Sequence, residues 1–230
     1  MNDGYAFPPP EPATLSITGR SDRFPVRRVY CVGRNYAAHA IEMGHDPDAE
    51  PPFFFQKNPD DLVADATTFP YPPASADVHH EIELLVALKE GGKDIAVDHA
   101  LAHVFGYGIA LDMTRRDRQG EMKKAGRPWE VGKAFEQSAP AGPIRPVADI
   151  GHPDTGEIRL SVNGESRQCG DLNQMIWKTA EVISILSTLF TLRPGDVILT
   201  GTPAGVGPVL HGDTMHGFIA GVGHLRVSVT

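Results

Sequence analysis

The stretch from His79 to Leu88, HHEIELLVAL, has the length and apolar content of a buried β-strand. On a strand, Glu81 and Glu83 project from one face, while Ile82 and Leu84 project from the other. Two carboxylates about 4 Å apart repel each other by roughly 4 kcal/mol at an effective dielectric constant near 20. A divalent cation would convert this repulsion into coordination, and all-oxygen ligation suits Mg²⁺, Mn²⁺ or Ca²⁺ better than zinc. A solvated strand face is the alternative, and the pair alone leaves both open.

A third carboxylate, Asp112, closes the apolar segment FGYGIALD at residues 105–112. In the polar segment that follows, Arg116 and Gln119 are three residues apart and share one face of a predicted helix. Asp112 is therefore either a third acid beside the glutamate pair or the N-cap of this helix.

Strands and helices do not alternate regularly around these segments, which argues against a doubly wound parallel sheet and favours an α+β, strand-rich fold with a few short helices. The dipeptide Asn163-Gly164 between two apolar runs predicts a β-hairpin. Cys31, in an apolar strand with no adjacent base, is expected to be a small core residue. The expected strands are 28–33, 53–55, 79–88, 105–113, 158–162, 165–168, 197–200 and 225–229. The expected helices are 35–43, 98–104, 114–125 and 173–189.

Composition narrows the class of protein. The chain has 230 residues with 41% hydrophobic side chains, and its 21 basic and 29 acidic residues give a formal net charge of −8. A nucleic-acid-binding protein would need a basic face, so none is expected. No apolar run reaches the roughly 18 residues of a membrane span, and two cysteines are too few for a disulfide framework. These features lead us to expect a cytoplasmic protein without membrane partners.

Prolines at positions 8, 9, 10 and 12 mark the beginning of the chain. They predict an extended N-terminal arm over residues 1–25 rather than a folded unit. Residues 26–230 are then expected to form a single domain, which the resemblance described next implies to be catalytic.

Six segments in this order resemble the fumarylacetoacetate hydrolase family, and together they span nearly everything after residue 26. They are CVGRNYAAHAIEMG (31–44), HHEIEL (79–84), LDMTRRDRQ (111–119), GRPWEVGKAF (126–135), VNGESRQ (162–168) and LTGTPAGVGP (199–208). The resemblance implies a mixed β-sheet roll, a homodimer, and a metal site formed by Glu81, Glu83 and Asp112. The expected cofactor is Mg²⁺ or Mn²⁺, with Ca²⁺ as a substitute in crystals.

The resemblance also implies catalytic roles. His39 and Glu42 are i, i+3 on a predicted helix, so Glu42 could orient His39 as the base that activates water. In related hydrolases this pair lies on a lid over the substrate; an exposed helix with an incidental ion pair is the alternative. Lys133, in the family's Gly-Lys-x-Phe pattern, is implied to be an active-site cation near the substrate.

Substrate-binding residues follow from the same resemblance. Arg116 and Gln119 match positions that line the site, and Gly201 and Thr202 lie in a loop that would offer a backbone N–H and a hydroxyl to a carboxylate. One departure concerns Lys57, because Asn58 separates it from a proline where the family usually has Lys-Pro, and its placement stays in doubt.

The whole pattern most resembles members that hydrolyse fumarylpyruvate and other acylpyruvates, which implies hydrolysis of a carbon–carbon bond in a β-diketo acid. A fumaryl group carries a second carboxylate, for which Arg34 and Arg127 are the nearest cationic candidates in the sequence. Alternatives on the same metal site are a general acylpyruvate hydrolase, an oxaloacetate decarboxylase or a 2-hydroxydiene-dioate isomerase. An alternative of another class is a non-catalytic protein that binds 2-oxo acids.

Overall fold

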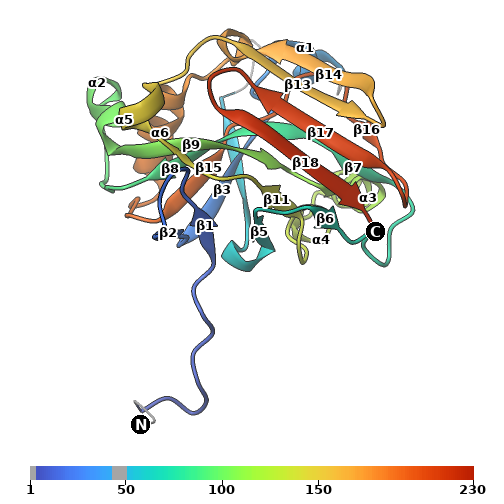
Figure 1. The fold of residues 1–230 in the computed structure, drawn as a ribbon, viewed down its shortest axis with the longest axis horizontal. Helices are drawn as coiled ribbons and strands as arrows, with labels where there is room; N and C mark the ends of the chain where they lie inside the picture. The colour runs from blue at the N-terminus through green and yellow to red at the C-terminus, as the bar shows by residue number, and fades with distance from the viewer. Residues whose placement is uncertain (1–3, 43–50) are drawn as a thin grey trace.

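The computed structural model describes residues 4–42 and 51–230, without the side chains of residues 39–41. It confirms a strand-rich α+β fold of mixed sheets with few helices (Figure 1). Much of the expected loop at 44–52 lies outside the described residues.

The largest sheet has eight strands and runs in the order β4-β3-β15-β8-β9-β11-β5, with β12 paired to β9. It is mixed, because β15 pairs in parallel with β3, and β11 with β5, whereas β8 and β9 are antiparallel. Residues on both faces of β8 are buried, which accounts for its apolar side chains at every position except Glu83. The strands are β3 (Arg28–Gly33), β4 (Phe53–Lys57), β5 (Leu62–Ala64), β8 (Ile82–Leu88), β9 (Val104–Leu111), β11 (Ala139–Ala141), β12 (Arg145–Pro146) and β15 (Asp196–Leu199).

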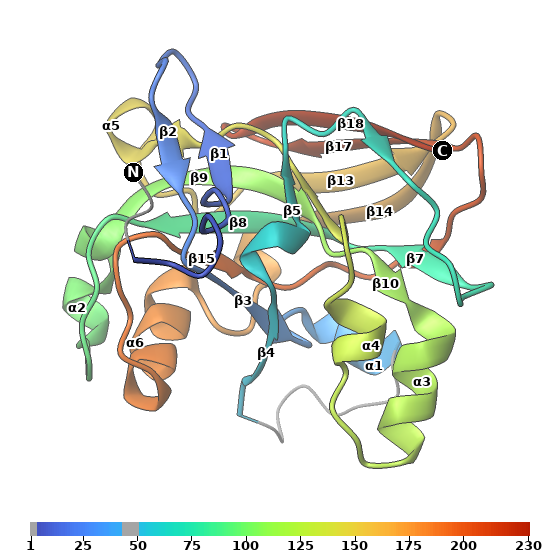
Figure 2. The same ribbon diagram turned by 90° about the horizontal axis from the view of Figure 1, so that it is seen from below.

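A five-stranded sheet covers one face of β8 and β9 (Figure 2). Its order is β14-β13-β17-β18-β6, and the hairpin between β13 and β14 turns at Asn163-Gly164, both with positive φ, as the dipeptide predicts. Ile82 and Ile109 from the large sheet meet Leu160 and Met215 in the main core. The strands are β6 (Thr68–Phe69), β13 (Glu157–Val162), β14 (Glu165–Asp171), β17 (Thr214–Ile219) and β18 (Gly223–Val229).

The expected strand 79–88 is interrupted at Glu81. Residues before it form β7 (Val78–His80), which pairs with β10 (Thr114–Arg115) and β16 (Gly207–Pro208) in a separate three-stranded sheet. Glu81 therefore lies at the junction of two sheets, where the chain passes from one to the other.

The helices are α1 (Ala37–Glu42), α2 (Val97–Ala100), α3 (Arg116–Lys124), α4 (Glu130–Lys133), α5 (Val147–Ile150) and α6 (Thr179–Leu189). Short 3₁₀ turns occupy 59–61, 101–103 and 172–174. The expected helix 98–104 is thus α2 followed by a 3₁₀ turn, and the expected helix 114–125 begins two residues late because Thr114 and Arg115 pair with β7. None of the described helices is long and apolar enough to cross a membrane.

The prediction of a helix from residue 173 is wrong, because α6 begins only at Thr179. The side chain of Asn35 accepts a hydrogen bond from the backbone N–H of Trp177 at 2.8 Å and donates to the Trp177 carbonyl at 2.9 Å. Its backbone carbonyl also accepts from the N–H of Ile176 at 2.8 Å. These bonds hold residues 176–177 in a non-helical conformation, which delays the helix.

The arm expected over residues 1–25 needs a correction in its second half. Residues 14–25 form a hairpin in which β1 (Thr14–Ser16) pairs with β2 (Arg23–Pro25). Leu15 and Phe24 are buried in a second core cluster that also holds Cys31, on the face of the large sheet near β3 and β15. Burial of these apolar side chains outweighs the extended preference of the prolines, which ends at Pro12.

Candidate metal centre and active-site pocket

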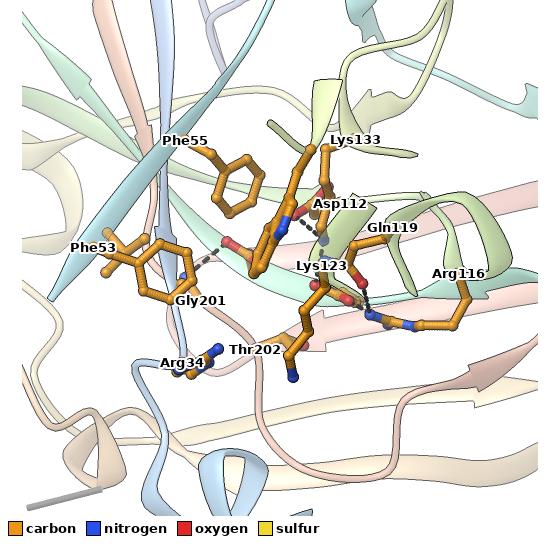
Figure 3. A pocket seen from close by; sticks show the side chains of 15 residues that line it. Arg34, Phe53, Phe55, Asp112, Arg116, Gln119, Lys123, Lys133, Gly201 and Thr202 are labelled. Atoms are coloured by element: carbon orange, nitrogen blue, oxygen red, sulfur yellow. Dashed lines mark hydrogen bonds and ion pairs between the residues drawn. The ribbon is translucent and has the colours of Figure 1, made fainter. Parts of the chain in front are cut away.

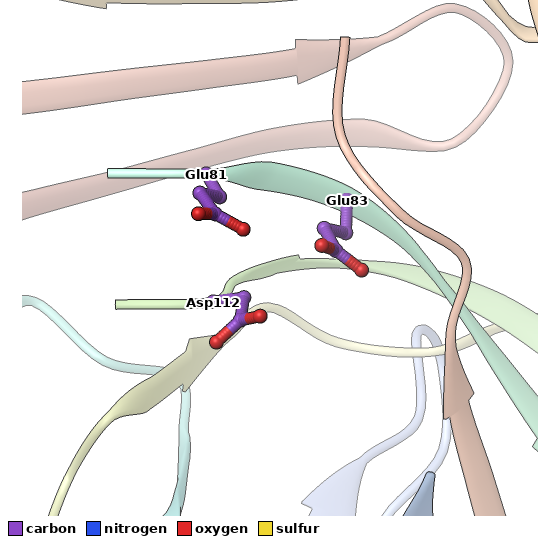
Figure 4. Close-up of side chains that lie close together, drawn as sticks. All are labelled: Glu81, Glu83 and Asp112. Atoms are coloured by element: carbon purple, nitrogen blue, oxygen red, sulfur yellow. The ribbon is translucent and has the colours of Figure 1, made fainter. Parts of the chain in front are cut away.

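Three carboxylates converge where β8 begins and β9 ends (Figure 4). Glu81 precedes β8, Glu83 lies within it, and Asp112 directly follows β9. The β8–β9 pairing sets Glu83 opposite Ala110, and the N–H of Asp112 donates to the Glu81 carbonyl at 2.8 Å. One ligand oxygen from each acid lies within 4.8 Å of the others, and all three residues are at least 95% buried.

Crowding of these acids in a buried site has an electrostatic cost. Burial, followed by the charges of Asp112 and Glu81, raises the pKa of Glu83 well above its ordinary value. Glu83 receives one hydrogen bond from the backbone N–H of Gly201 at 2.7 Å. The donor set is one carboxylate oxygen from each of three buried acids, and it fits a divalent cation that prefers oxygen ligands. Asp112 does not cap the following helix, whose N-cap residue is Arg115.

Lys133, at the end of α4, places its ammonium among the same carboxylates. Its Nζ lies 2.9 Å from Glu81 Oε2, 2.7 Å from Asp112 Oδ2 and 2.7 Å from the Thr114 hydroxyl. Burial alone lowers the pKa of Lys133, but Asp112 and Glu81 outweigh it, and the pKa ends above its ordinary value. Lys133 is therefore charged and shares two of the carboxylates that a metal ion would use.

Arg116 and Gln119, both on α3, add further polar side chains to the centre. The Arg116 guanidinium donates to Glu81 Oε1, and its second terminal nitrogen donates to Gln119 Oε1 at 2.6 Å. Arg116 thus contacts both Gln119 and the metal-ligand candidate Glu81. Its contact with Gln119 agrees with the helix face that these two residues were expected to share.

Lys57, which the sequence left in doubt, is fully part of the centre. Its buried Nζ lies 2.8 Å from Asp112 Oδ1 and donates to Ser138 Oγ at 2.9 Å, to the Met113 carbonyl at 3.2 Å and to the Lys133 carbonyl. Asn58 does not displace it, because β4 ends at Lys57 and Asn58 begins the following 3₁₀ turn.

The loop after β15 forms hydrogen bonds with Glu83 and with the backbone of β8. The N–H of Gly201 is bonded to Glu83, and the Thr202 hydroxyl donates to the Ile82 carbonyl at 2.7 Å while accepting from Gln168 Nε2 at 2.7 Å. The two donors expected to meet a substrate carboxylate are thus engaged within the protein. Gly201 has φ +91°, and a Cβ there would lie 2.8 Å from Asn35 Cβ, so the position requires glycine.

A pocket opens over the three acids (Figure 3). Phe53, Phe55 and Trp129 form an aromatic wall, with the rings of Phe53 and Trp129 edge to face at a centroid separation of 5.2 Å. The pocket brings together nine of the predicted site residues: Arg34, Glu81, Glu83, Asp112, Arg116, Gln119, Lys133, Gly201 and Thr202.

Several lining residues had no predicted role. Trp129 lies in a segment that carried the resemblance, Phe53 and Phe55 in an expected strand and Lys123 in an expected helix, but nothing in their local pattern marked them as a pocket wall. Buried Gln168 was also missed, although it bonds both Thr202 and the N–H of Ile82 and so joins the loop to β8.

The expected catalytic pair is only partly described. Glu42 is exposed at the end of α1, and its carboxylate oxygens lie 3.3 Å from the N–H of Gly205. The side chain of His39 lies outside the described residues, and its pairing with Glu42 stays a prediction.

Comparisons with known proteins place the chain among relatives that match most of its length. A family sequence model described as "Fumarylacetoacetate (FAA) hydrolase C-terminal" matches residues 28–230. The crystal structure of fumarylpyruvate hydrolase from Pseudomonas aeruginosa in complex with Mn²⁺ and pyruvate superposes with a TM-score of 0.97 at 52% identity, covering 98% of this chain and 99% of that chain.

Relatives with different activities also match along most of their length. The oxaloacetate tautomerase YcgM of Escherichia coli is 44% identical over 194 residues, which cover 84% of this chain and 88% of the relative. A fumarylpyruvate hydrolase of a Ralstonia species is 39% identical over 184 residues, which cover 80% of this chain and 95% of the relative.

Proposed function

The chain belongs to the fumarylacetoacetate hydrolase family, and from this premise we propose that it hydrolyses a carbon–carbon bond in an acylpyruvate, with fumarylpyruvate as its substrate. The products would be fumarate and pyruvate. Water supplies an oxygen to the acyl carbonyl carbon, the bond from that carbon to the neighbouring CH₂ breaks, and this CH₂ gains a proton to become the pyruvate methyl group. The single observation that carries the proposal is the cluster of Glu81, Glu83 and Asp112 at the floor of a pocket lined by cationic side chains.

Glu81, Glu83 and Asp112 would hold Mg²⁺ or Mn²⁺, which would polarise the 2-keto oxygen and stabilise the negative charge that develops on the leaving pyruvyl half. Arg116 orients Glu81 and Gln119, while Lys133 supplies a fixed positive charge beside the reacting carbonyl groups. Because these cations are already in place before substrate arrives, they stabilise developing charge without reorganisation.

Activation of water is assigned to His39, with Glu42 as its orienting partner. Both lie on α1, which begins shortly after the pocket residue Arg34. His39 would take a proton from water, and Glu42 would stabilise the imidazolium that forms.

The far end of the substrate is assigned to the aromatic side of the pocket. The Arg34 guanidinium lies over the Phe53 ring at 5.1 Å, and a second groove that shares Arg34, Phe53 and Trp129 is also lined by Arg127. A planar fumaryl group could pack against the rings with its terminal carboxylate near the two arginines. A charge of −8 repels a dianion at long range, so these local arginines must supply the attraction.

A second candidate is conversion of oxaloacetate, by tautomerisation or decarboxylation. The match to an oxaloacetate tautomerase at 44% identity favours it, and oxaloacetate carries the same 2-oxo-acid group for the metal site. A 2-hydroxydiene-dioate isomerase or a non-catalytic protein that binds 2-oxo acids would use the same cluster.

One panel of assays separates these functions. Purified protein with Mn²⁺ or Mg²⁺ is offered fumarylpyruvate, acetylpyruvate, fumarylacetoacetate and oxaloacetate, and pyruvate release and enol absorbance are followed. The proposal expects the highest kcat/KM for fumarylpyruvate. Turnover of oxaloacetate alone would replace it with the second candidate, and binding of oxalate without any turnover would indicate a non-catalytic protein.

A further inference from the structure

His79 is a residue that the proposed mechanism leaves without a role. It lies on β7, two residues before the metal-ligand candidate Glu81, and pairs in register with Thr114 of β10. Its ring does not line the pocket, but Nδ1 of this ring lies 3.3 Å from Nε of Arg116, which does. His79 therefore contacts a cationic side chain of the site from outside the pocket.

The direction of this contact follows from the chemistry of the two groups. An arginine Nε–H can only donate, so Nδ1 of His79 is the unprotonated nitrogen of a neutral ring. The proton is then on Nε2, which lies 2.9 Å from Oδ1 of Asp77 and donates to it. Asp77 thus selects the tautomer of His79 that can accept a hydrogen bond from Arg116.

This contact completes the fixing of the Arg116 guanidinium (Figure 3). Its two terminal nitrogens donate to Glu81 Oε1 and to Gln119 Oε1, and its Nε donates to His79. Because all three nitrogens are engaged, both the position and the rotation of the plane are fixed. These bonds to described residues use three of the five N–H donors of an arginine, so two remain for a ligand in the pocket that Arg116 lines.

A separate set of contacts holds the backbone beside the guanidinium. The Asp77 carbonyl accepts from the backbone N–H of Arg116 at 2.7 Å, and the Asp117 carboxylate accepts from the Ser75 hydroxyl at 2.7 Å. These bonds join the loop before β7 to the first turn of α3, and they involve no atom of the His79 side chain. Replacing that side chain should therefore free the guanidinium without displacing α3.

We propose that His79 is a positioning residue: oriented by Asp77, it fixes the Arg116 guanidinium so that its two remaining N–H groups meet a carboxylate or keto oxygen of the substrate. The inference deepens the proposed function and rests on it for the class of substrate, a 2-oxo acid. A histidine with an incidental contact is the alternative, and it predicts that His79 has no influence on ligand binding.

Nuclear magnetic resonance tests the hydrogen-bond chain without any substrate, in full-length protein with diamagnetic Mg²⁺. Long-range ¹H–¹⁵N spectra should show the His79 ring protonated at Nε2 and unprotonated at Nδ1. The Nε–H signal of Arg116, assigned with Arg116→Lys, should exchange with water about tenfold faster or more in His79→Leu. A ring protonated at Nδ1, or an unchanged exchange rate in His79→Leu, would overturn the proposal.

Binding of oxalate in the presence of Mg²⁺, measured by calorimetry, gives the functional readout, because oxalate resembles the carboxyl and keto end of a 2-oxo acid. His79→Leu should raise the oxalate Kd by about tenfold, the effect of losing a charge-assisted contact. His79→Asn can place an acceptor oxygen near the position of Nδ1 and should restore binding to within about threefold of wild type. Exposed His99→Leu is the matched control and should keep the wild-type Kd.

A double-mutant cycle separates positioning from a general structural role. In the Arg116→Lys background there is no Nε–H to hold, so adding His79→Leu should change the oxalate Kd no further. Circular dichroism verifies that all variants are folded, and His79→Ala takes the place of the leucine variant if that one is not. Additive effects in the cycle, or an unchanged Kd in His79→Leu alone, would overturn the proposal. A wild-type chain that binds no oxalate would contradict the proposed function instead, and the resonance spectra would then decide the role of His79.

Discussion

Lys57 and Asp112 form a fully buried ion pair, with 2.8 Å between Nζ and Oδ1, while Lys133 lies 2.7 Å from the other oxygen of the same carboxylate. Asp112 is thus held between two lysines from different parts of the chain. Lys57 also bonds Ser138 and the Met113 carbonyl and does not line the pocket, so it holds Asp112 from the protein side.

Replacing Lys57 should destabilise the protein. Lys57→Met removes one partner of a buried pair, and the charge left behind costs roughly 3–5 kcal/mol. Thermal denaturation without metal should show a clearly lower Tm, and Mn²⁺ affinity by calorimetry should fall because Asp112 loses its fixed orientation. The exposed Lys89→Met is the matched control and should behave as wild type. Equal melting curves for the two variants would remove Lys57 from this role.

Glu83→Gln should abolish metal binding and turnover without unfolding the protein. It should also change the pH dependence of metal-free stability. Burial raises the pKa of Glu83 above its ordinary value of 4.5, so the ionised form destabilises the folded state. Wild-type stability should therefore fall, relative to the variant, as pH rises above 4.5 and through the folded-state pKa.

Chemical denaturation across this pH range measures that difference. Exposed Glu165→Gln serves as the control, since its carboxylate lies outside the site. Parallel pH profiles for wild type and Glu83→Gln would show that the crowding of acids at the site has no energetic consequence.

Lys133→Met should separate metal binding from catalysis. The Lys133 ammonium contacts two candidate ligands, Glu81 and Asp112, and so competes with any cation bound there. Its removal should tighten Mn²⁺ binding by calorimetry, while kcat falls because a positive charge beside the reacting groups is lost. Lys124→Met, at the exposed end of α3, is the control. Weaker metal binding in Lys133→Met would mean that the lysine supports the metal instead of opposing it.

His39→Ala should remove most hydrolysis, by about 10²–10⁴-fold in kcat, as loss of a general base does. Binding of Mn²⁺ and of oxalate should survive, because His39 lies outside the carboxylate cluster. Retention of near wild-type kcat would assign the activation of water to another group.

Arg34→Ala and Arg127→Ala should reduce kcat/KM for fumarylpyruvate by about 10–150-fold, the effect of losing a charge-assisted contact of roughly 1.5–3 kcal/mol. Acetylpyruvate, which lacks the second carboxylate, should be affected little. Exposed Arg167→Ala is the control. If the wild-type enzyme treats both substrates equally, no far-end carboxylate site exists.

Local patterns predicted much of this fold and site. The apolar run 79–88 contains β8, and Asn163-Gly164 marks the hairpin of β13 and β14, because short-range backbone preferences determine both. The three acids were found because paired carboxylates beside an apolar strand are unusual and because six segments resemble one family.

Features that depend on distant parts of the chain were not predictable. The role of Lys57 requires β4 to lie beside β3 and the chain to return at Ser138, 81 residues later. The late start of α6 depends on hydrogen bonds from Asn35, 142 residues before Trp177. Burial of β1–β2 likewise needs a sheet face assembled from residues far downstream, and prolines nearby give no sign of it.

The ion pairs in the pocket affect whether the protein folds before or after it binds a metal ion. Lys57, Lys133 and Arg116 form ion pairs with Asp112 and Glu81, so the chain's own cations balance two of the three clustered acids. Small zinc domains are unfolded until metal neutralises and gathers their ligands. Under the proposed function we expect this polypeptide to complete its folding first and to bind a metal ion afterwards, so metal supply in the cell would govern how many molecules are active rather than how many are folded.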